Sequence, residues 1–231
     1  MPLAKRLVAE FVGTGLLLAA VVGSGIMGDR LANGNVAIAL LANTVATGAT
    51  LVALILTFGP ISAAHLNPAV TLADAWQHGI SWRQVPAYVL AQVGGAFVGV
   101  AAAHLMFGEE LFSVSRHIRS GGAQMFSEFV ATFGLLAVIW GCARSRSSVV
   151  AFAVGGYITG AYWFTASTSF ANPAVTVARS FTNTFAGIRP VDAGFIVAQL
   201  AGALAATALC TWLIPSLPAE AKAVVVPHAQ E

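Results

Sequence analysis

The tripeptide Asn-Pro-Ala occurs twice in this chain, as Asn67-Pro68-Ala69 and as Asn172-Pro173-Ala174, and both copies lie in apolar surroundings. Asparagine is a good helix N-cap, and proline fits the first helical position because its missing N–H would have no partner there. Each copy therefore predicts the start of a short helix after an irregular stretch. In a membrane such breaks are tolerated only where they line a watery cavity or are buried in protein, and paired breaks in two repeats indicate a transport site.

The composition places the chain in a lipid bilayer. Of its 231 residues, 58% are hydrophobic and only 9% are charged, against roughly 25% charged residues in ordinary soluble domains. A helix that crosses the hydrocarbon core needs roughly 20 apolar residues. Six segments meet this requirement: 7–27, 36–58, 85–107, 124–142, 149–168 and 192–214. The predicted fold is an all-α membrane protein of six transmembrane helices and two half-helices.

The two halves of the chain repeat one another. Residues 9–14 match 127–132, and residues 92–96 match 199–203, so Glu, Asn-Pro-Ala and Gln recur in the same order. Three spans per half is an odd number, so the second repeat is inverted and the two half-helices meet near the midplane. We predict one channel domain over 1–231, divided into four parts. These are repeat 1 at 5–107, a connecting loop at 108–123, repeat 2 at 124–214 and a short tail at 215–231.

The paired Asn-Pro-Ala loops and the inverted repeat resemble the aquaporin (major intrinsic protein) family, and over residues 5–214 its aquaglyceroporins. The resemblance implies a homotetramer with one pore in each protomer, and no cofactor, bound metal or nucleic acid. It also implies cytoplasmic termini, for which the loop charges give a weak positive-inside bias. That orientation puts six basic residues inside (Lys5, Arg6, Arg83, Arg144, Arg146, Lys222) and five outside (Arg30, Arg116, Arg119, Arg179, Arg189).

Asn67 and Asn172 are expected to point their amides into the pore where the half-helix N-termini converge. Each terminus carries about half a positive charge, so the pair repels cations. The stretches before them, 63–66 and 168–171, are predicted to be extended, with carbonyls facing the pore as acceptors. The family commonly has glycine at Ala63 and Ala64, so a positive φ there would strain these alanines. His65 suits either a brace for its loop or a pore contact.

Two acidic residues, Glu10 and Glu128, lie deep within predicted spans, one in each repeat. An intramembrane carboxylate is a functional candidate by default. The resemblance favours a supporting role, in which each carboxylate accepts hydrogen bonds from the non-helical backbone of one loop. Their duplication fits a brace for each loop better than a proton relay.

The predicted selectivity filter departs from the family. Most members have arginine directly after the second Asn-Pro-Ala, where this chain has Val175. Fixed spacing from the two loops assigns the other filter positions to Thr47, Gly160 and Ser169. This ring would be wide, uncharged and partly apolar. A slip in that alignment would instead let Tyr162, Trp163 and Phe164 narrow the mouth, although these aromatic residues also suit an interfacial belt.

Arg179 lies four positions after Val175, on the same face of the half-helix and one turn further out. One interpretation is an arginine that snorkels to the surface. The other is a positive charge displaced from the constriction into the vestibule, where it still discourages cations.

The sequence therefore predicts a passive channel for small uncharged solutes: glycerol-like polyols, water and undissociated metalloid hydroxides such as arsenite. The resemblance extends to a bacterial branch linked to arsenic handling, which suggests the bacterial inner membrane. A water-selective channel and an ion-coupled secondary transporter are the alternatives, although no coupling residue beyond the two glutamates is visible. No catalytic nucleophile, metal set or phosphate loop points to an enzyme. Cys142 and Cys210 lie within predicted spans, as expected for apolar packing residues.

Overall fold

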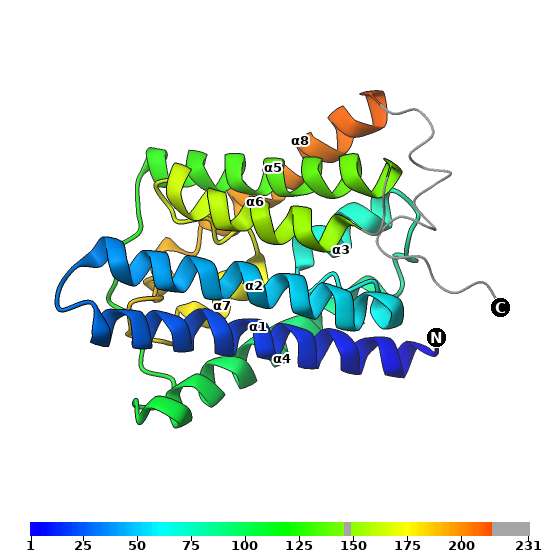
Figure 1. The fold of residues 1–231 in the computed structure, drawn as a ribbon. Coiled ribbons are helices and arrows are strands. Elements are labelled where there is room, and N and C mark those ends of the chain that lie inside the picture. The colour runs from blue at the N-terminus through cyan, green and yellow to red at the C-terminus, as the bar shows by residue number, and fades with distance from the viewer. Residues whose placement is uncertain (146–148, 214–231) are drawn as a thin grey trace.

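The computed structural model describes residues 1–145 and 149–213, so the predicted tail at 215–231 lies outside the described residues. The described chain is built from helices in the following order: α1 (Leu3–Leu31), α2 (Val36–Ser62), α3 (Pro68–Trp76), α4 (Val85–Phe107), α5 (Gly122–Ser145), α6 (Val150–Phe164), α7 (Pro173–Arg179), the short 3-10 helix η2 (Pro190–Asp192) and α8 (Phe195–Leu213) (Figure 1).

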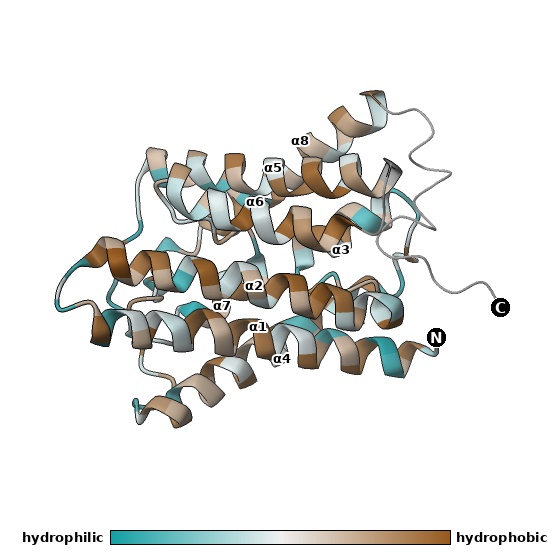
Figure 2. Ribbon diagram, viewed as in Figure 1, coloured by the Kyte–Doolittle hydropathy of each residue, from teal (hydrophilic) through white to brown (hydrophobic). Residues whose placement is uncertain are grey.

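Five of these helices (α1, α2, α4, α5 and α8) are long and apolar enough to cross a membrane. The sixth predicted span, 149–168, is shorter than expected, because α6 ends at Phe164 and the chain then turns toward the second Asn-Pro-Ala loop. Figure 2 shows hydrophobic residues along the lengths of the helices, with many hydrophilic positions at their ends and in the connections. The all-helical membrane fold predicted from composition is therefore confirmed.

The helices form two repeats of opposite orientation. α1 runs from the N-terminus toward the loop that connects α4 to α5, whereas α5 starts at that loop and runs the other way (Figure 1). We call the end of the molecule that holds the N-terminus the terminus side, and the end that holds residues 108–121 the connector side. The main helix contacts repeat as well: α1 packs on α2 and α4, and α5 packs on α6 and α8.

The half-helices hold the two repeats together. α3 of the first repeat contacts α8 of the second, and α7 of the second contacts α4 of the first. The end of α3 is tied to the terminus side, where the Gln77 amide donates to the Thr211 hydroxyl at 2.5 Å. The end of α7 is tied to the connector side, where the Ser115 N–H donates to the Ser180 carbonyl at 3.0 Å. The half-helices thus run apart from a common midplane.

Glycine permits the closest helix crossings, at matching places in the two repeats. A Cβ on Gly95 of α4 would overlap the carbonyl oxygen of Phe11 in α1, and a Cβ on Gly202 of α8 would overlap that of Phe129 in α5. Small residues let membrane helices approach closely where lipid supplies no hydrophobic force between them. These crossings position Glu10 and Glu128, one residue before each of the two phenylalanines, against the loops that they contact.

Candidate functional site

The two asparagines cap the half-helices and join the two loops. The Asn67 side-chain oxygen accepts from the Ala69 N–H at 2.9 Å, and the Asn172 oxygen accepts from the Ala174 N–H at 3.0 Å. Each amide nitrogen donates across the repeat boundary: that of Asn67 to the Ala171 carbonyl at 2.7 Å, and that of Asn172 to the Leu66 carbonyl at 2.8 Å. Because an amide carries two N–H hydrogens, one on each asparagine remains for the lumen.

The loops before the asparagines are not extended, which corrects the expectation for 63–66 and 168–171. Three residues in each loop have a positive φ at matching positions: Ala63 (74°), Ala64 (48°), Leu66 (50°), Thr168 (61°), Ser169 (50°) and Ala171 (48°). Non-glycine residues in such conformations cost of order 1–3 kcal/mol each and persist only where the surroundings hold them. The strain anticipated for alanine at 63 and 64 is therefore present.

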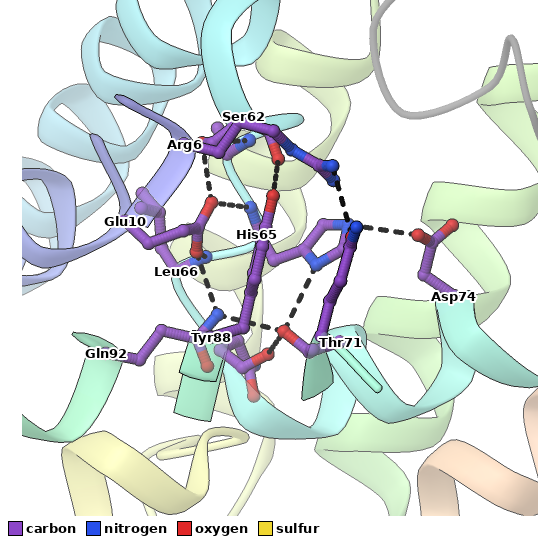
Figure 3. Close-up of polar contacts among 12 residues, drawn as sticks. Arg6, Glu10, Ser62, His65, Leu66, Thr71, Asp74, Tyr88 and Gln92 are labelled. Atoms are coloured by element: carbon purple, nitrogen blue, oxygen red, sulfur yellow. Dashed lines mark hydrogen bonds and ion pairs between the residues drawn. The ribbon is translucent and has the colours of Figure 1, made fainter. Parts of the chain in front are cut away.

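A buried carboxylate holds the first loop in this conformation. Glu10 accepts hydrogen bonds from the backbone N–H groups of His65 at 2.9 Å and Leu66 at 2.7 Å, and from the Ser62 hydroxyl at 2.7 Å. The Gln92 amide also donates to Glu10, at 2.8 Å (Figure 3). The carboxylate is fully buried, so these four bonds supply the partners that a charged oxygen pair needs away from water.

The second loop has the same arrangement. Glu128 accepts from the backbone N–H groups of Phe170 at 2.9 Å and Ala171 at 2.8 Å, and from the Gln199 amide at 2.6 Å. Gln199 also donates to the Thr176 hydroxyl, just as Gln92 donates to Thr71 in the first repeat. The repeated glutamines, visible in the sequence without an evident role, therefore connect each carboxylate to its half-helix.

A narrow cavity runs between the repeats past both asparagines. Side chains of α1, α2, α5 and α6, most of them apolar, form about half of its wall, and the two loops and the half-helices α3 and α7 form the rest. The wall includes Leu17, Val21, Leu51, Ile55, Leu135, Ile139, Val154 and Ile158. A solute in this cavity therefore meets hydrocarbon on one side and backbone and amide groups on the other.

Three of the four predicted filter residues line this cavity, and the fourth does not. Thr47, Ser169 and Val175 are buried in its wall. Gly160 is exposed on the outer face of α6, with no atom of another segment within 4 Å of its Cβ position. The residues of α6 that face the cavity recur every fourth position and end with Tyr162. Since two residues correspond to about 200° around a helix, Gly160 points away from the pore, and its assignment was wrong.

Tyr162 is therefore the residue that α6 contributes to the ring. The ring was predicted to be wide because Gly160 was assigned to it, and the larger side chain of Tyr162 narrows it. Its hydroxyl donates to the Thr47 hydroxyl at 3.3 Å, which joins α6 to α2 at this level. Trp163 and Phe164 are exposed and lie outside the cavity wall, as aromatic residues at a membrane interface do. Of the three aromatic residues considered, only Tyr162 lines the cavity.

Arg179 is buried in the cavity wall, with 2% of its surface exposed, so it does not snorkel to the surface. Its guanidinium lies 3.5 Å from the ring centroid of Phe170, a cation–π contact, and its Nε donates to the Ala186 carbonyl. Among the described residues, neither Nη1 of Arg179 nor the hydroxyl of Ser169 has a hydrogen-bond partner, although both atoms are buried. The ring thus carries the unpartnered hydroxyl of Ser169, and one turn further out the cavity wall carries the unpartnered donor and the positive charge of Arg179.

A second arginine, Arg119 of the connecting loop, supports the same ring. Its guanidinium donates to the carbonyls of Gly187 at 2.9 Å and Ser167 at 3.3 Å, and lies 5.2 Å from the ring centroid of Phe170. Burial lowers the pKa of Arg119, but an arginine remains charged at physiological pH. Arg119 therefore ties the connecting loop to the second Asn-Pro-Ala loop.

His65 both lines the cavity and braces its loop. Its Nδ1 lies 3.1 Å from the Thr71 hydroxyl, and its ring packs on Tyr88 with centroids 5.5 Å apart. Its Nε2 lies 3.3 Å from an oxygen of Asp74, in ion-pair range but without hydrogen-bond geometry. Figure 3 shows Asp74 pointing toward this imidazole.

Sequence reasoning left four residues of this site without a role: Tyr88, Asp74, Phe170 and Arg119. The repeat itself carried a signal for the first three. The offset of 105 residues between the motifs pairs His65 with Phe170 and Asp74 with Arg179, and Tyr88 occupies the place that Phe195 has in the second repeat. Arg119 lies in the connecting loop, where no repeat partner could indicate it.

Comparison with known proteins agrees with this geometry. Residues 1–149 match the family model described as major intrinsic protein. The chain is 56% identical over 218 residues to aquaglyceroporin AqpS of Rhizobium meliloti (strain 1021), covering 94% of this chain and 93% of that protein. It is 33% identical over 210 residues to aquaporin NIP1-3 of Oryza sativa subsp. japonica, covering 87% and 72%.

The fold is similar to the X-ray structure of the aquaglyceroporin from Plasmodium falciparum. The TM-score is 0.70 at 20% sequence identity, with 94% of this chain and 99% of that chain covered. The family match, the relatives and the paired loops agree: this chain belongs to the major intrinsic protein family, whose members are membrane channels and not enzymes.

Proposed function

We propose that this chain is a passive channel for small uncharged polyhydroxy solutes: glycerol-sized polyols, and undissociated metalloid hydroxides such as arsenous acid. The observation that carries this proposal is the composition of the buried ring and of the cavity wall next to it, where Arg179 lies. The Ser169 hydroxyl and the Arg179 guanidinium are available to solute hydroxyls, while Val175 offers an apolar surface to a solute's carbon side. A trihydroxy solute can use both surfaces as it replaces its hydration shell.

The similarity to a protein named aquaglyceroporin supports this solute class. A water-selective channel remains the second candidate, and Tyr162 is the observation that favours it. Its aromatic ring occupies the place where a glycine had been expected, and a narrow ring admits water more readily than a polyol. The relative fluxes of glycerol and water distinguish the two candidates.

The test uses purified protein in liposomes, with protein-free liposomes of the same lipid as the control. Stopped-flow light scattering measures water and glycerol entry, and a filtration assay measures uptake of arsenous acid. The proposal predicts that all three fluxes exceed the lipid-only rates and do not saturate at millimolar solute. A rise in water flux alone would support the water-selective candidate instead. Initial rates that depend on a Na⁺ or proton gradient would contradict passive conduction.

We further propose cytoplasmic termini and a bacterial inner membrane. Two of the basic residues counted on the connector side, Arg119 and Arg179, contact Phe170 at the pore and are not free loop charges. The remaining bias favours a cytoplasmic terminus side. We also propose a homotetramer with one pore per protomer, and the pore in each protomer is supported by the cavity that passes both asparagines within one chain. Accessibility of an introduced cysteine and crosslinking in the membrane test these two proposals.

A further inference from the structure

The two mouths of the pore are built alike and differ in the charge of one residue. On the terminus side the pore residue His65 contacts Asp74, and on the connector side its repeat partner Phe170 contacts Arg179. Both contacts join a loop residue to the half-helix residue nine positions later. The aromatic side chain that packs on each loop residue is also at an equivalent position. His65 packs on Tyr88, and Phe170 packs on Phe195 with ring centroids 5.4 Å apart.

The remaining charges near each mouth balance: buried Asp192 forms an ion pair with Arg189 on the connector side, and each loop carboxylate has one half-buried guanidinium nearby. One such carboxylate and one guanidinium belong to each mouth: Glu10 and Arg6 on the terminus side, where Arg6 lies 5.1 Å from the Tyr88 centroid, and Glu128 and Arg119 on the connector side. These pairs cancel within each mouth. With a neutral imidazole at His65, Asp74 therefore leaves the terminus-side mouth with one negative charge, and Arg179 leaves the other mouth with one positive charge.

Positive elements alone cannot exclude all ions from such a pore. The half-helix N-termini meet at Asn67 and Asn172 and present their positive ends to the lumen. Together with Arg179 they repel cations, but they attract anions. A channel for uncharged solutes, the proposed function on which this inference rests, also needs a barrier to anions.

We propose that Asp74 is that barrier, and so a specificity-determining residue of the channel. Its carboxylate is buried with 2% of its surface exposed, and among the described residues its Oδ1 has no hydrogen-bond partner. It lies seven residues after Asn67, about 10 Å along the half-helix from the positive N-terminus. An anion attracted to the midplane is therefore repelled by a negative charge that lies directly behind His65 of the cavity wall, whereas an uncharged solute is not.

The test compares chloride permeability of wild-type and Asp74→Asn channels in liposomes, measured with an entrapped chloride-sensitive dye in buffers of increasing alkaline pH. A unit charge about 6 Å from an ion, at the effective dielectric of protein near a surface, changes the population of that ion by roughly a hundredfold. We expect Asp74→Asn to raise the ratio of chloride permeability to glycerol permeability at least tenfold.

Two further variants control for charge and shape. Asp74→Glu retains the carboxylate and should exclude chloride, and Asp29→Asn removes one carboxylate from an exposed position of α1 and should change nothing. Unchanged chloride permeability in Asp74→Asn, with normal glycerol flux in the same vesicles, overturns this inference and leaves the proposed function intact. Absence of glycerol flux in the wild type would instead contradict the proposed function.

The pH dependence of chloride permeability in the wild type tests the same inference without any substitution. The imidazole of His65 is faced by Arg6 and Glu10 of α1, Asp74 of α3 and Tyr88 of α4. Protonation of this imidazole adds a positive charge that cancels Asp74, so chloride permeability should rise as the pH is lowered from alkaline to acidic values. Chloride permeability that stays flat over this range would also overturn the inference.

Discussion

Replacing Glu128 with glutamine should destabilise the second loop more than any other single-atom change in the site. The carboxylate holds two backbone N–H groups and the Gln199 amide. A glutamine keeps one oxygen, and the least costly orientation directs its NH₂ at the Phe170 N–H, where two donors then face each other. Loss of a hydrogen bond to a charged group costs about 1.5–3 kcal/mol, and an unsatisfied buried donor about 1–3 kcal/mol. We expect a loss of about 3–5 kcal/mol in the free energy of unfolding.

Unfolding of the purified protein in detergent, followed by tryptophan fluorescence during denaturant titration, measures this loss. Glu110→Gln makes the same chemical change at an exposed position of the connecting loop, and should alter the free energy of unfolding by less than about 0.5 kcal/mol. A loss below about 1 kcal/mol for Glu128→Gln would show that the strained loop does not depend on the carboxylate, and would refute this reasoning.

Two further predictions concern the helix crossing and the ring. Gly95→Ala should cost about 1–3 kcal/mol of unfolding free energy through overpacking against Phe11. Gly156→Ala is the control, because its Cβ would meet nothing within 4 Å, and it should be neutral or stabilising in the same titration. Equal effects of the two substitutions would contradict the role of the helix crossing. Arg179→Gln should raise sodium permeability about tenfold in liposomes, equivalent to about 1.4 kcal/mol, because the half-helix termini remain as a partial barrier. An unchanged sodium flux would leave Arg179 a packing residue only.

Much of the architecture could be predicted because each part leaves a local chemical signature. A membrane helix requires a long apolar run, and a half-helix that starts inside the membrane requires a cap, which Asn67 and Asn172 supply. The buried glutamates were visible because a carboxylate in an apolar span is conspicuous. The hydrogen bonds of Glu10 and Glu128 to the loop backbones follow from the same need, since each buried oxygen must find a donor.

The errors arose where the answer depends on contacts between distant segments. The face that α6 turns to the pore is set by its packing on α2 and α5, so spacing carried over from the second motif selected Gly160 in place of Tyr162. The positive φ angles of the loops depend on the carboxylates and on the asparagine bonds across the repeat boundary, which join residues more than a hundred positions apart. The role proposed for Asp74 as a barrier to anions likewise depends on a structural comparison, that of its contact with His65 and the contact between Arg179 and Phe170.

The most direct test of the account is the ratio of glycerol to water permeability in Val175→Arg. The central claim is that solutes are selected at the ring of Thr47, Tyr162, Ser169 and Val175, in which residue 175 is apolar and uncharged. An arginine at 175 would fill the apolar side of that ring. Both permeabilities are measured on one vesicle preparation with quantified protein. We predict that the ratio falls about tenfold, equivalent to about 1.4 kcal/mol of added barrier, while water flux remains above the lipid-only rate. An unchanged ratio would contradict the claim that residue 175 lines the constriction.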